Sequence, residues 1–413
     1  MRAGFGRQAI TPHKPMKMAG FDRRTELSTG ILDELYSSVL LLEDETDALF
    51  SFVSLDVLGV DHKLCTLIRK TLSPVLSLRE DRIWVSSTHS HSAPSHIFSG
   101  MESYDPAFVS FLLEQTKEAG KQALEDLAPC APYIAHSHAT GVASLRNKGA
   151  EGSDFPMPIH VTKLCRKDDS LSFCHFTCHP TVLDEKNTLY SKDIPGAAAK
   201  RLPKNQFCLF HNGACADIST RFTRNGSTPK ELDRLGGILG DAIVDAPYAP
   251  GTTFGARITS AETVLHLSRG AGVDGQEREA LIGALQEKLA ACDDPRMKRE
   301  YDSRLAVLER SVAAAETDRP IRIAAVDFGP YLYASLPFEV DSKDGEELET
   351  LLTQAAGKPV YLICYTGGYD GYLPSGNPLT ADSSYEDFAS RYYPQSRRQV
   401  WESAKQCVLN TKL

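Results

Sequence analysis

Three pairs of short apolar runs, each pair joined by a tight turn, constrain the fold of this chain more than any other feature. The turns contain Glu-Asp-Glu, Lys-Asp-Asp and Gly-Pro in chain order. The runs span residues 37–42 with 49–58, 159–165 with 171–178, and 321–328 with 331–336. Runs of this length on either side of a short turn predict β-hairpins. Antiparallel strand pairs are therefore expected at three places along the chain.

Longer amphipathic stretches separate these hairpins and predict helices. They span residues 61–72, 106–127, 195–202, 229–245, 274–292, 296–316 and 395–409. Further strands are predicted by single apolar runs at 82–92, 207–211 and 360–364. Because hairpins alternate with helices, the expected fold class is α/β in the mixed α+β sense. We expect mixed sheets with hairpins, flanked by helices, in preference to one purely parallel sheet.

Composition and charge exclude several classes of protein. The 413 residues are 42% hydrophobic and 24% charged, which is typical of a folded globular chain. The formal net charge is −9 and Lys and Arg form no stripe, which argues against a nucleic-acid partner. No apolar run reaches the length of about 18 residues that a transmembrane helix needs. The first residues contain no signal-peptide segment, so we expect a cytoplasmic protein whose ten cysteines are reduced.

Two histidine-containing segments fall where predicted strands end. His89 and His91 are separated by one residue, so in an extended segment their side chains point the same way. Imidazole is the commonest metal ligand, although both residues are also consistent with a polar loop. The segment 174–180 places its two histidines on one strand face and its two cysteines on the other. We expect these cysteines to face the core and His179 to be an exposed residue at the strand end.

Three further segments place polar side chains near strand ends. The small-residue loop after the run at 207–211 carries Asp217 and Ser219, which are also ordinary residues of loops and helix caps. Glu339 closes an apolar strand, where a carboxylate is costly to bury without a metal or a charge partner. An ion-paired surface position is the alternative for Glu339. Tyr372 lies in a glycine- and tyrosine-rich segment whose rings are also consistent with the lining of a groove.

Together these segments supply two histidines, a glutamate and a tyrosine, each at or just after a strand end. Three protein ligands with one open position is the usual pattern of a catalytic zinc site. The ligand types favour zinc over the other common divalent ions.

The order of these segments resembles the neutral/alkaline non-lysosomal ceramidase family, in its N-terminal catalytic domain. The resemblance implies one catalytic domain over residues 1–413, with a helical insertion or subdomain at about 274–318. It rests on Gly4-Phe5-Gly6-Arg7-Gln8-Ala9-Ile10-Thr11-Pro12, Met18-Ala19-Gly20-Phe21, Ser54-Leu55-Asp56, Thr88-His89-Ser90-His91-Ser92, Asp193-Ile194-Pro195-Gly196, Pro337-Phe338-Glu339 and Tyr369-Asp370-Gly371-Tyr372.

The resemblance also implies a role for individual residues. His91 would bind substrate or handle a proton beside the metal. Ser219, which follows Asp217 in an Asp-Ile-Ser motif, matches the family's proposed nucleophile. Arg146 and Tyr385 match groups that hold the oxyanion. One Zn²⁺ per chain would be bound by His89, His179, Glu339 and Tyr372.

The implied chemistry is the hydrolysis of an N-acyl amide, either ceramide or another N-acylated small molecule. Zinc polarises a carbonyl or lowers the pKa of bound water to about 7, and one oxyanion donor contributes about 3 kcal/mol. Two attacking groups remain open, namely Ser219 and a zinc-bound hydroxide. Two other functions also remain open: a zinc-dependent esterase or other hydrolase on the same scaffold, and a non-catalytic metal-binding protein.

The chain departs from the family pattern in three respects. We expect no C-terminal immunoglobulin-like domain and no secretion signal, and Ala216 stands where the larger enzymes typically have Gly. The first two departures favour a substrate other than ceramide. The four predicted metal ligands are unaffected by them. The motifs do not specify the acyl chain, the head group or the oligomeric state.

Overall fold

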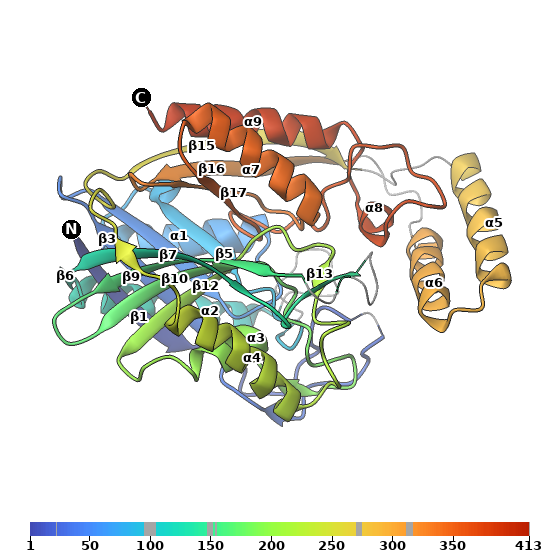
Figure 1. The fold of residues 1–413 in the computed structure, drawn as a ribbon, viewed down its shortest axis with the longest axis horizontal. Coiled ribbons are helices and arrows are strands. Elements are labelled where there is room, and N and C mark those ends of the chain that lie inside the picture. Colours follow the sequence, from blue (N-terminus) through green and yellow to red (C-terminus); the bar gives the residue numbers. More distant parts are fainter. Residues whose placement is uncertain are drawn as a thin grey trace.

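The structure is a computed structural model that describes residues 1–21, 23–94, 105–146, 152, 155–269, 275–310 and 317–412. Three mixed sheets form its body, and each has helices on its outer face (Figure 1). The predicted fold class is confirmed. Among the helices that the structure describes, none combines the length and the apolar character needed to cross a membrane.

The first sheet has the strand order β5-β4-β3-β1-β6. Its strands are β1 (Arg2–Ala9), β3 (Tyr36–Glu43), β4 (Leu49–Leu55), β5 (Ile83–Ser87) and β6 (Ala128–Pro129). The predicted hairpin is β3–β4, and β5 pairs parallel to β4 after a crossover through helix α1 (His62–Leu76). Helix α2 (Pro106–Glu125) packs with α1 on the outer face.

The second sheet has the strand order β12-β10-β9-β7-β14. Its strands are β7 (Ala131–Ala139), β9 (Met157–Cys165), β10 (Ser170–Phe176), β12 (Gln206–Asn212) and β14 (Ala249–Pro250). Here the predicted hairpin is β9–β10, and β12 pairs parallel to β10. Helices α3 (Ile194–Ala199) and α4 (Pro229–Val244) cover this sheet.

The third sheet has the strand order β15-β16-β17-β18. Its strands are β15 (Thr259–Arg269), β16 (Thr317–Asp327), β17 (Leu332–Ser335) and β18 (Val360–Ile363). The predicted hairpin is β16–β17, and β18 pairs parallel to β17. Helices α7 (Ser342–Ala356) and α9 (Ser396–Asn410) lie over this sheet.

All three sheets therefore contain one connection in common, a hairpin followed by a helix and a parallel strand. The helix that follows each hairpin begins with an aspartate whose carboxylate accepts a hydrogen bond from a backbone N–H of the first turn. These caps are Asp61 for α1, Asp193 for α3 and Asp341 for α7. Because such caps satisfy backbone donors that a helix leaves free, they fix where each crossover helix begins.

The inner faces of the three sheets share one aromatic core. Alternate residues of each strand face this core, and the residues between them face the covering helices, so the central strands are buried on both sides. Phe52 of the first sheet packs on Phe173 of the second with a ring-centroid distance of 4.4 Å. Phe173 in turn lies 5.0 Å from Tyr333 of the third sheet. The loops that follow the strands are thereby held in fixed positions relative to one another.

A pair of helices, α5 (Gly275–Ala291) and α6 (Pro295–Arg310), stands beside the body at the right of Figure 1. These helices lie within the predicted insertion at about 274–318, of which residues 274 and 311–316 fall outside the described part of the chain. A small hydrophobic cluster joins the pair to helix α8 (Tyr385–Ala389). Its buried members are Leu281, Leu285, Leu305, Leu308 and Phe388. The assignment of one catalytic domain with an insertion stays a prediction.

Short elements complete the fold. They are β2 (Gly30–Ile31) paired with β11 (Leu189–Tyr190), β8 (Ser144–Leu145) paired with β13 (Ile218–Ser219), and the 3₁₀ turn η1 (Glu80–Arg82). All ten cysteines lie in the described residues and are free thiols, as predicted.

Two predicted strands end earlier than expected. The run predicted to extend to residue 92 stops at Ser87, and His89 adopts a left-handed conformation with φ 65°. The run predicted to extend to residue 178 stops at Phe176. In both places the chain leaves the sheet before it reaches the histidine of interest, so strand alternation does not determine where the ring points.

Candidate metal centre and active site

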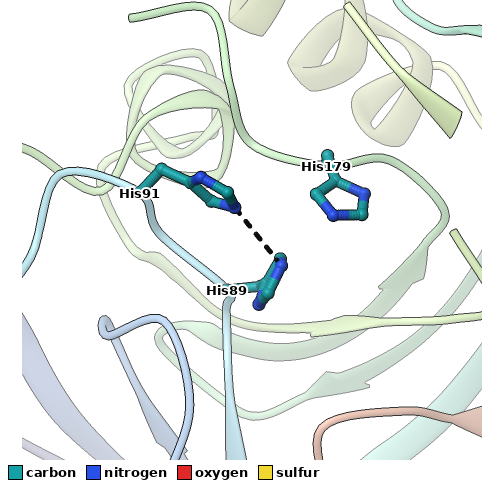
Figure 2. A group of neighbouring side chains, drawn as sticks. All are labelled: His89, His91 and His179. Carbon is teal, nitrogen blue, oxygen red and sulfur yellow. Dashed lines mark hydrogen bonds between the residues drawn. The ribbon is translucent and has the colours of Figure 1, made fainter. Parts of the chain in front are cut away.

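Three histidines converge where strands of the first two sheets end (Figure 2). His89 and His91 follow β5, and His179 follows β10. One ring nitrogen from each lies within 4.8 Å of the others. His89 and His179 are buried, whereas His91 is partly exposed. The strand ends thus bring together residues that are far apart in the sequence.

The orientation of His89 is fixed by its backbone and by its neighbours. Its left-handed conformation turns the chain sharply after β5. Its Nδ1 lies 2.8 Å from the carbonyl oxygen of Leu58, and since a carbonyl oxygen only accepts, Nδ1 carries the proton. The ring of Tyr365 stacks on the imidazole at a centroid distance of 4.2 Å. The Nε2 lone pair of His89 therefore faces the other histidines.

His179 is oriented in the same way from the second sheet. Its Nδ1 donates to the carbonyl oxygen of Cys215 at 2.7 Å, so Nε2 again carries the lone pair. The prediction that His179 is exposed is wrong, because only 2% of its surface is accessible. The chain turns inward after β10, and the main chain of His179 pairs with that of Ser219. Burial lowers the pKa of His179 to about 4, so the imidazole is neutral near pH 7.

Glu339, which follows β17 of the third sheet, faces both of these nitrogens. Its Oε2 lies 3.0 Å from Nε2 of His179 and 3.4 Å from Nε2 of His89. Its Oε1 accepts a hydrogen bond of 2.5 Å from the hydroxyl of Tyr369. Burial by itself would raise the pKa of Glu339, but positive charge on the side of His89 and His179 would hold it well below its usual range. Glu339 is therefore an ionised and buried carboxylate.

This arrangement fits a metal ion. The protons of His89 and His179 point away, toward backbone carbonyls, so two lone pairs face an ionised carboxylate at short range. Like charges and lone pairs at such distances repel in a buried site. A cation bound between His89, His179 and Glu339 would remove the repulsion, because both Nε2 lone pairs and the carboxylate would coordinate it. Imidazole and carboxylate donors are those that zinc prefers.

His91 lies beside the same cluster. Its Nε2 is 3.3 Å from Nε2 of His89, and burial together with the nearby His89 and His179 lowers its pKa well below the usual value. The edge of Phe21 packs against the ring at 5.0 Å. Gly20 has φ +94°, and a side chain there would overlap the imidazole. Gly20 and Phe21, which belong to one N-terminal motif, thus pack against the His91 ring.

Tyr372, the fourth predicted ligand, is joined to Glu339 through the main chain. Glu339 N donates to the carbonyl of Gly371 at 2.9 Å, and Leu373 N donates to the carbonyl of Glu339 at 2.9 Å. Burial and the nearby Glu339 raise the pKa of the Tyr372 hydroxyl well above its usual value. Its ring lies 6.0 Å from that of Tyr385. The structure brings Tyr372 to the centre, and its role as a ligand stays a prediction.

Arg146 connects the centre to helix α8. Its guanidinium NH2 lies 3.1 Å from Oε1 of Glu386, which follows Tyr385 in that helix. Its backbone N donates to the carbonyl of Asp217 at 2.7 Å. Burial opposes ionisation, but Glu386, Tyr372 and other nearby acidic groups raise the pKa of Arg146 above its usual value. The side chain is therefore a fixed positive charge.

Ser219 and Asp217 lie in and next to β13, but their environments differ. Ser219 is buried next to His179, and its Oγ accepts from Arg221 N at 3.4 Å. Asp217 accepts from both the backbone N and the Oγ of Ser342, each at 2.8 Å. Since Ser342 is the first residue of α7, these bonds favour a structural role for Asp217 over the predicted catalytic one.

Three residues of the site are absent from the sequence-based assignment. Tyr365 stacks on His89, Tyr369 donates to Glu339, and Glu386 pairs with Arg146. The two tyrosines belong to the glycine- and tyrosine-rich segment, which was assigned only its Tyr372. Glu386 adjoins the predicted Tyr385. The sequence indicates these three residues only because each lies close to an assigned residue.

A fold of three mixed sheets with a His–His–Glu cluster at the strand ends defines a candidate metalloenzyme. The chain belongs to the neutral/alkaline non-lysosomal ceramidase family, because the model of that family's N-terminal part matches residues 1–208, just over half of the 413 residues. The family resemblance seen in the sequence is confirmed.

Solved structures give the same fold. A crystal structure of neutral ceramidase from Pseudomonas aeruginosa matches with a TM-score of 0.77 at 14% identity, over 99% of this chain and 74% of that one. A structure described as ceramidase complexed with C2 matches with a TM-score of 0.77 at 13% identity, over 100% of this chain and 75% of that one. Identities this low show the fold alone. No curated protein matches the chain.

Proposed function

We propose that the protein is a zinc-dependent hydrolase that cleaves an N-acyl amide bond, in ceramide or in another N-acylated small molecule. One zinc ion per chain would be held by His89, His179, Glu339 and Tyr372. The observation that carries the proposal is the convergence of two Nε2 lone pairs on the Glu339 carboxylate, while both Nδ1 protons are held by backbone carbonyls. Membership of the ceramidase family supports the hydrolase class.

When bound, zinc would supply Lewis-acid polarisation of the scissile carbonyl and activation of water. The protein's own residues would do the rest. Arg146 carries a fixed positive charge beside Tyr372 and helix α8, which suits it to stabilise a developing oxyanion together with the hydroxyl of Tyr385. His91 is partly exposed and lies 3.3 Å from Nε2 of His89, which places it to accept or donate a proton beside the centre.

Two groups are candidates for the attack on the carbonyl. Ser219 is adjacent to His179 through the main chain, and its hydroxyl oxygen accepts a hydrogen bond of 3.4 Å from Arg221 N. The second candidate is a water molecule activated at the metal. Ser219→Ala separates them, because loss of a nucleophile reduces turnover by several orders of magnitude, whereas a positioning serine contributes far less.

The experiment is a substrate panel with matched amides and esters of short and long acyl chains. Zinc-loaded protein, chelator-treated protein and Ser219→Ala would be assayed side by side. The proposal predicts zinc-dependent cleavage of at least one N-acyl amide. Cleavage of esters without amides would instead support the esterase alternative. Zinc binding without turnover of any member would support a non-catalytic metal-binding protein.

A further inference from the structure

The loop from Gly367 to Leu373 binds Glu339 through its main chain and through one side chain. Its main chain pairs with that of Glu339 on both sides, through Gly371 and Leu373. Its Tyr369 donates a hydrogen bond of 2.5 Å to Oε1 of Glu339. The other oxygen, Oε2, is the atom that faces the two imidazoles. One oxygen of the carboxylate is thus fixed by the protein, and the other is presented to the metal centre.

The position of Tyr369 is itself fixed by its neighbour Asp370. The Asp370 side chain is fully buried and contacts Nε2 of His62, the first residue of α1. The hydroxyl of Tyr392 donates to its other oxygen at 2.8 Å, and Asp370 N donates to the carbonyl of Pro337 at 2.8 Å. Three distant parts of the chain therefore anchor the residue next to Tyr369.

The ring of Tyr369 is also enclosed. A side chain at Gly59 would approach ring atom Cγ to 2.5 Å, so glycine there allows the loop after β4 to lie against the ring. The face of Tyr365 stacks at a centroid distance of 6.2 Å, and Tyr365 also stacks on His89. The Tyr369 ring therefore packs against both Gly59 and Tyr365, and its hydroxyl is directed at Glu339.

We propose that Tyr369 is a positioning residue of the metal centre, which fixes the Glu339 carboxylate so that Oε2 stays directed at the ion. The inference rests on the proposed function, since it assumes that a metal is bound. The phenol hydroxyl of Tyr369 donates its proton to the carboxylate oxygen, which can only accept. Without this bond the carboxylate gains rotational freedom, and metal binding has to offset that freedom.

The test measures zinc affinity directly, without any substrate. Apo wild-type protein, Tyr369→Phe and Tyr331→Phe would compete with a chromophoric chelator for zinc at neutral pH. Tyr331→Phe is the matched control, because it also removes a buried hydroxyl, bonded to Thr162 at 2.5 Å in the central core. We expect Tyr369→Phe to bind zinc about 10- to 100-fold more weakly and Tyr331→Phe to match the wild type.

A double-mutant cycle distinguishes positioning from an independent effect. If Tyr369 acts through Glu339, then adding Tyr369→Phe to Glu339→Gln weakens zinc binding little further. Additive losses would overturn the inference, and so would equal affinities of Tyr369→Phe and the wild type. Tyr392→Phe provides a second route, since loss of its bond to Asp370 is expected to weaken zinc binding by a smaller factor.

Zinc binding by the wild type distinguishes failure of the proposed function from failure of the Tyr369 role alone. A wild-type protein that binds no zinc overturns the proposed function and this inference together. A wild-type protein that binds zinc with an affinity independent of the Tyr369 hydroxyl overturns this inference alone and leaves the proposed function standing.

Discussion

At the scale of single residues, the direction of ring protons determines what the centre can bind. The backbone carbonyls of Leu58 and Cys215 accept hydrogen bonds from Nδ1 of His89 and of His179, respectively. Such partners fix the tautomer and the orientation of a metal-binding imidazole. The third ring, His91, has no hydrogen-bond partner for its buried Nδ1 among the described residues. It is therefore less constrained than the other two.

His91→Ala is expected to retain zinc while losing activity. Oε2 of Glu339 lies within 3.4 Å of Nε2 of both His89 and His179, so these three groups would balance the charge of an ion without His91. A general acid or base contributes about 10²- to 10⁴-fold to the rate, and a loss of that size is predicted. Metal content and kcat would be measured on the same preparation.

The exposed His138 of β7 supplies the control for this experiment, as His138→Ala. Zinc loss in His91→Ala as complete as in His89→Ala would contradict the prediction. That result would make His91 a third imidazole ligand, which the 4.8 Å cluster of ring nitrogens would accommodate.

How far the sequence predicts these residues depends on how local their environment is. The two histidine motifs identify His89 and His179 as candidate ligands. The burial of His179 and the left-handed turn at His89 do not follow from strand alternation, because both strands end before the histidine. Only packing between different sheets determines where these rings point.

At the scale of elements, helix α7 couples the third sheet to the centre and carries a group that titrates near neutrality. Glu349 accepts a hydrogen bond of 2.8 Å from Leu362 N of β18. Burial raises its pKa from 4.5 to about 7, although the bond from Leu362 opposes the shift. A raised pKa stabilises the folded state below pH 4.5, and this stabilisation is lost as the pH rises through about 7.

Glu349→Gln is therefore expected to flatten the dependence of stability on pH. Gln keeps the acceptor for Leu362 N and cannot ionise, so the variant gains stability over the wild type at about pH 8 relative to about pH 5. Allowing for partial exposure of the side chain, a gain of about 1 kcal/mol is expected. Denaturant unfolding at both pH values measures it, with the exposed Glu45→Gln as control. Parallel pH profiles of wild type and Glu349→Gln would contradict the prediction.

The α5–α6 pair is expected to unfold locally without affecting the sheets. Its core is small, and Leu285 is fully buried within it. Leu285→Ala removes about 2–5 kcal/mol of packing, so backbone hydrogen exchange should accelerate in α5, α6 and α8. Zinc content should not change. The surface variant Glu287→Ala is the control, and faster exchange in β16 or β17 would show that the pair is not an independent unit.

The same scale explains which elements follow from the sequence. Each predicted hairpin is present, because a hairpin joins neighbouring runs through a turn whose residues are visible. The parallel pairings of β5, β12 and β18 join segments separated by a helix, and no local pattern specifies them. Strand β15 and helix α7 were not predicted. Only one residue of β15, Leu267, is buried, so the apolar pattern of this strand is weak.

At the scale of the whole molecule, the candidate ligands come from different sheets. His89 follows a strand of the first sheet, His179 of the second and Glu339 of the third. These sheets also share the aromatic core. The repeated connection of hairpin, helix and parallel strand places comparable strand ends around one point. The centre is thus a property of the assembled fold, which a motif-by-motif analysis of the sequence identifies only through family resemblance.

The most direct test of the proposed metal centre is the metal content of protein purified without chelator, measured by elemental analysis. The wild type, His89→Ala, Glu339→Ala and the control His138→Ala would be compared. We predict about one zinc per chain in the wild type and the control, and loss of the zinc in both ligand variants. Wild-type protein that holds no metal, even after incubation with zinc, would contradict this prediction.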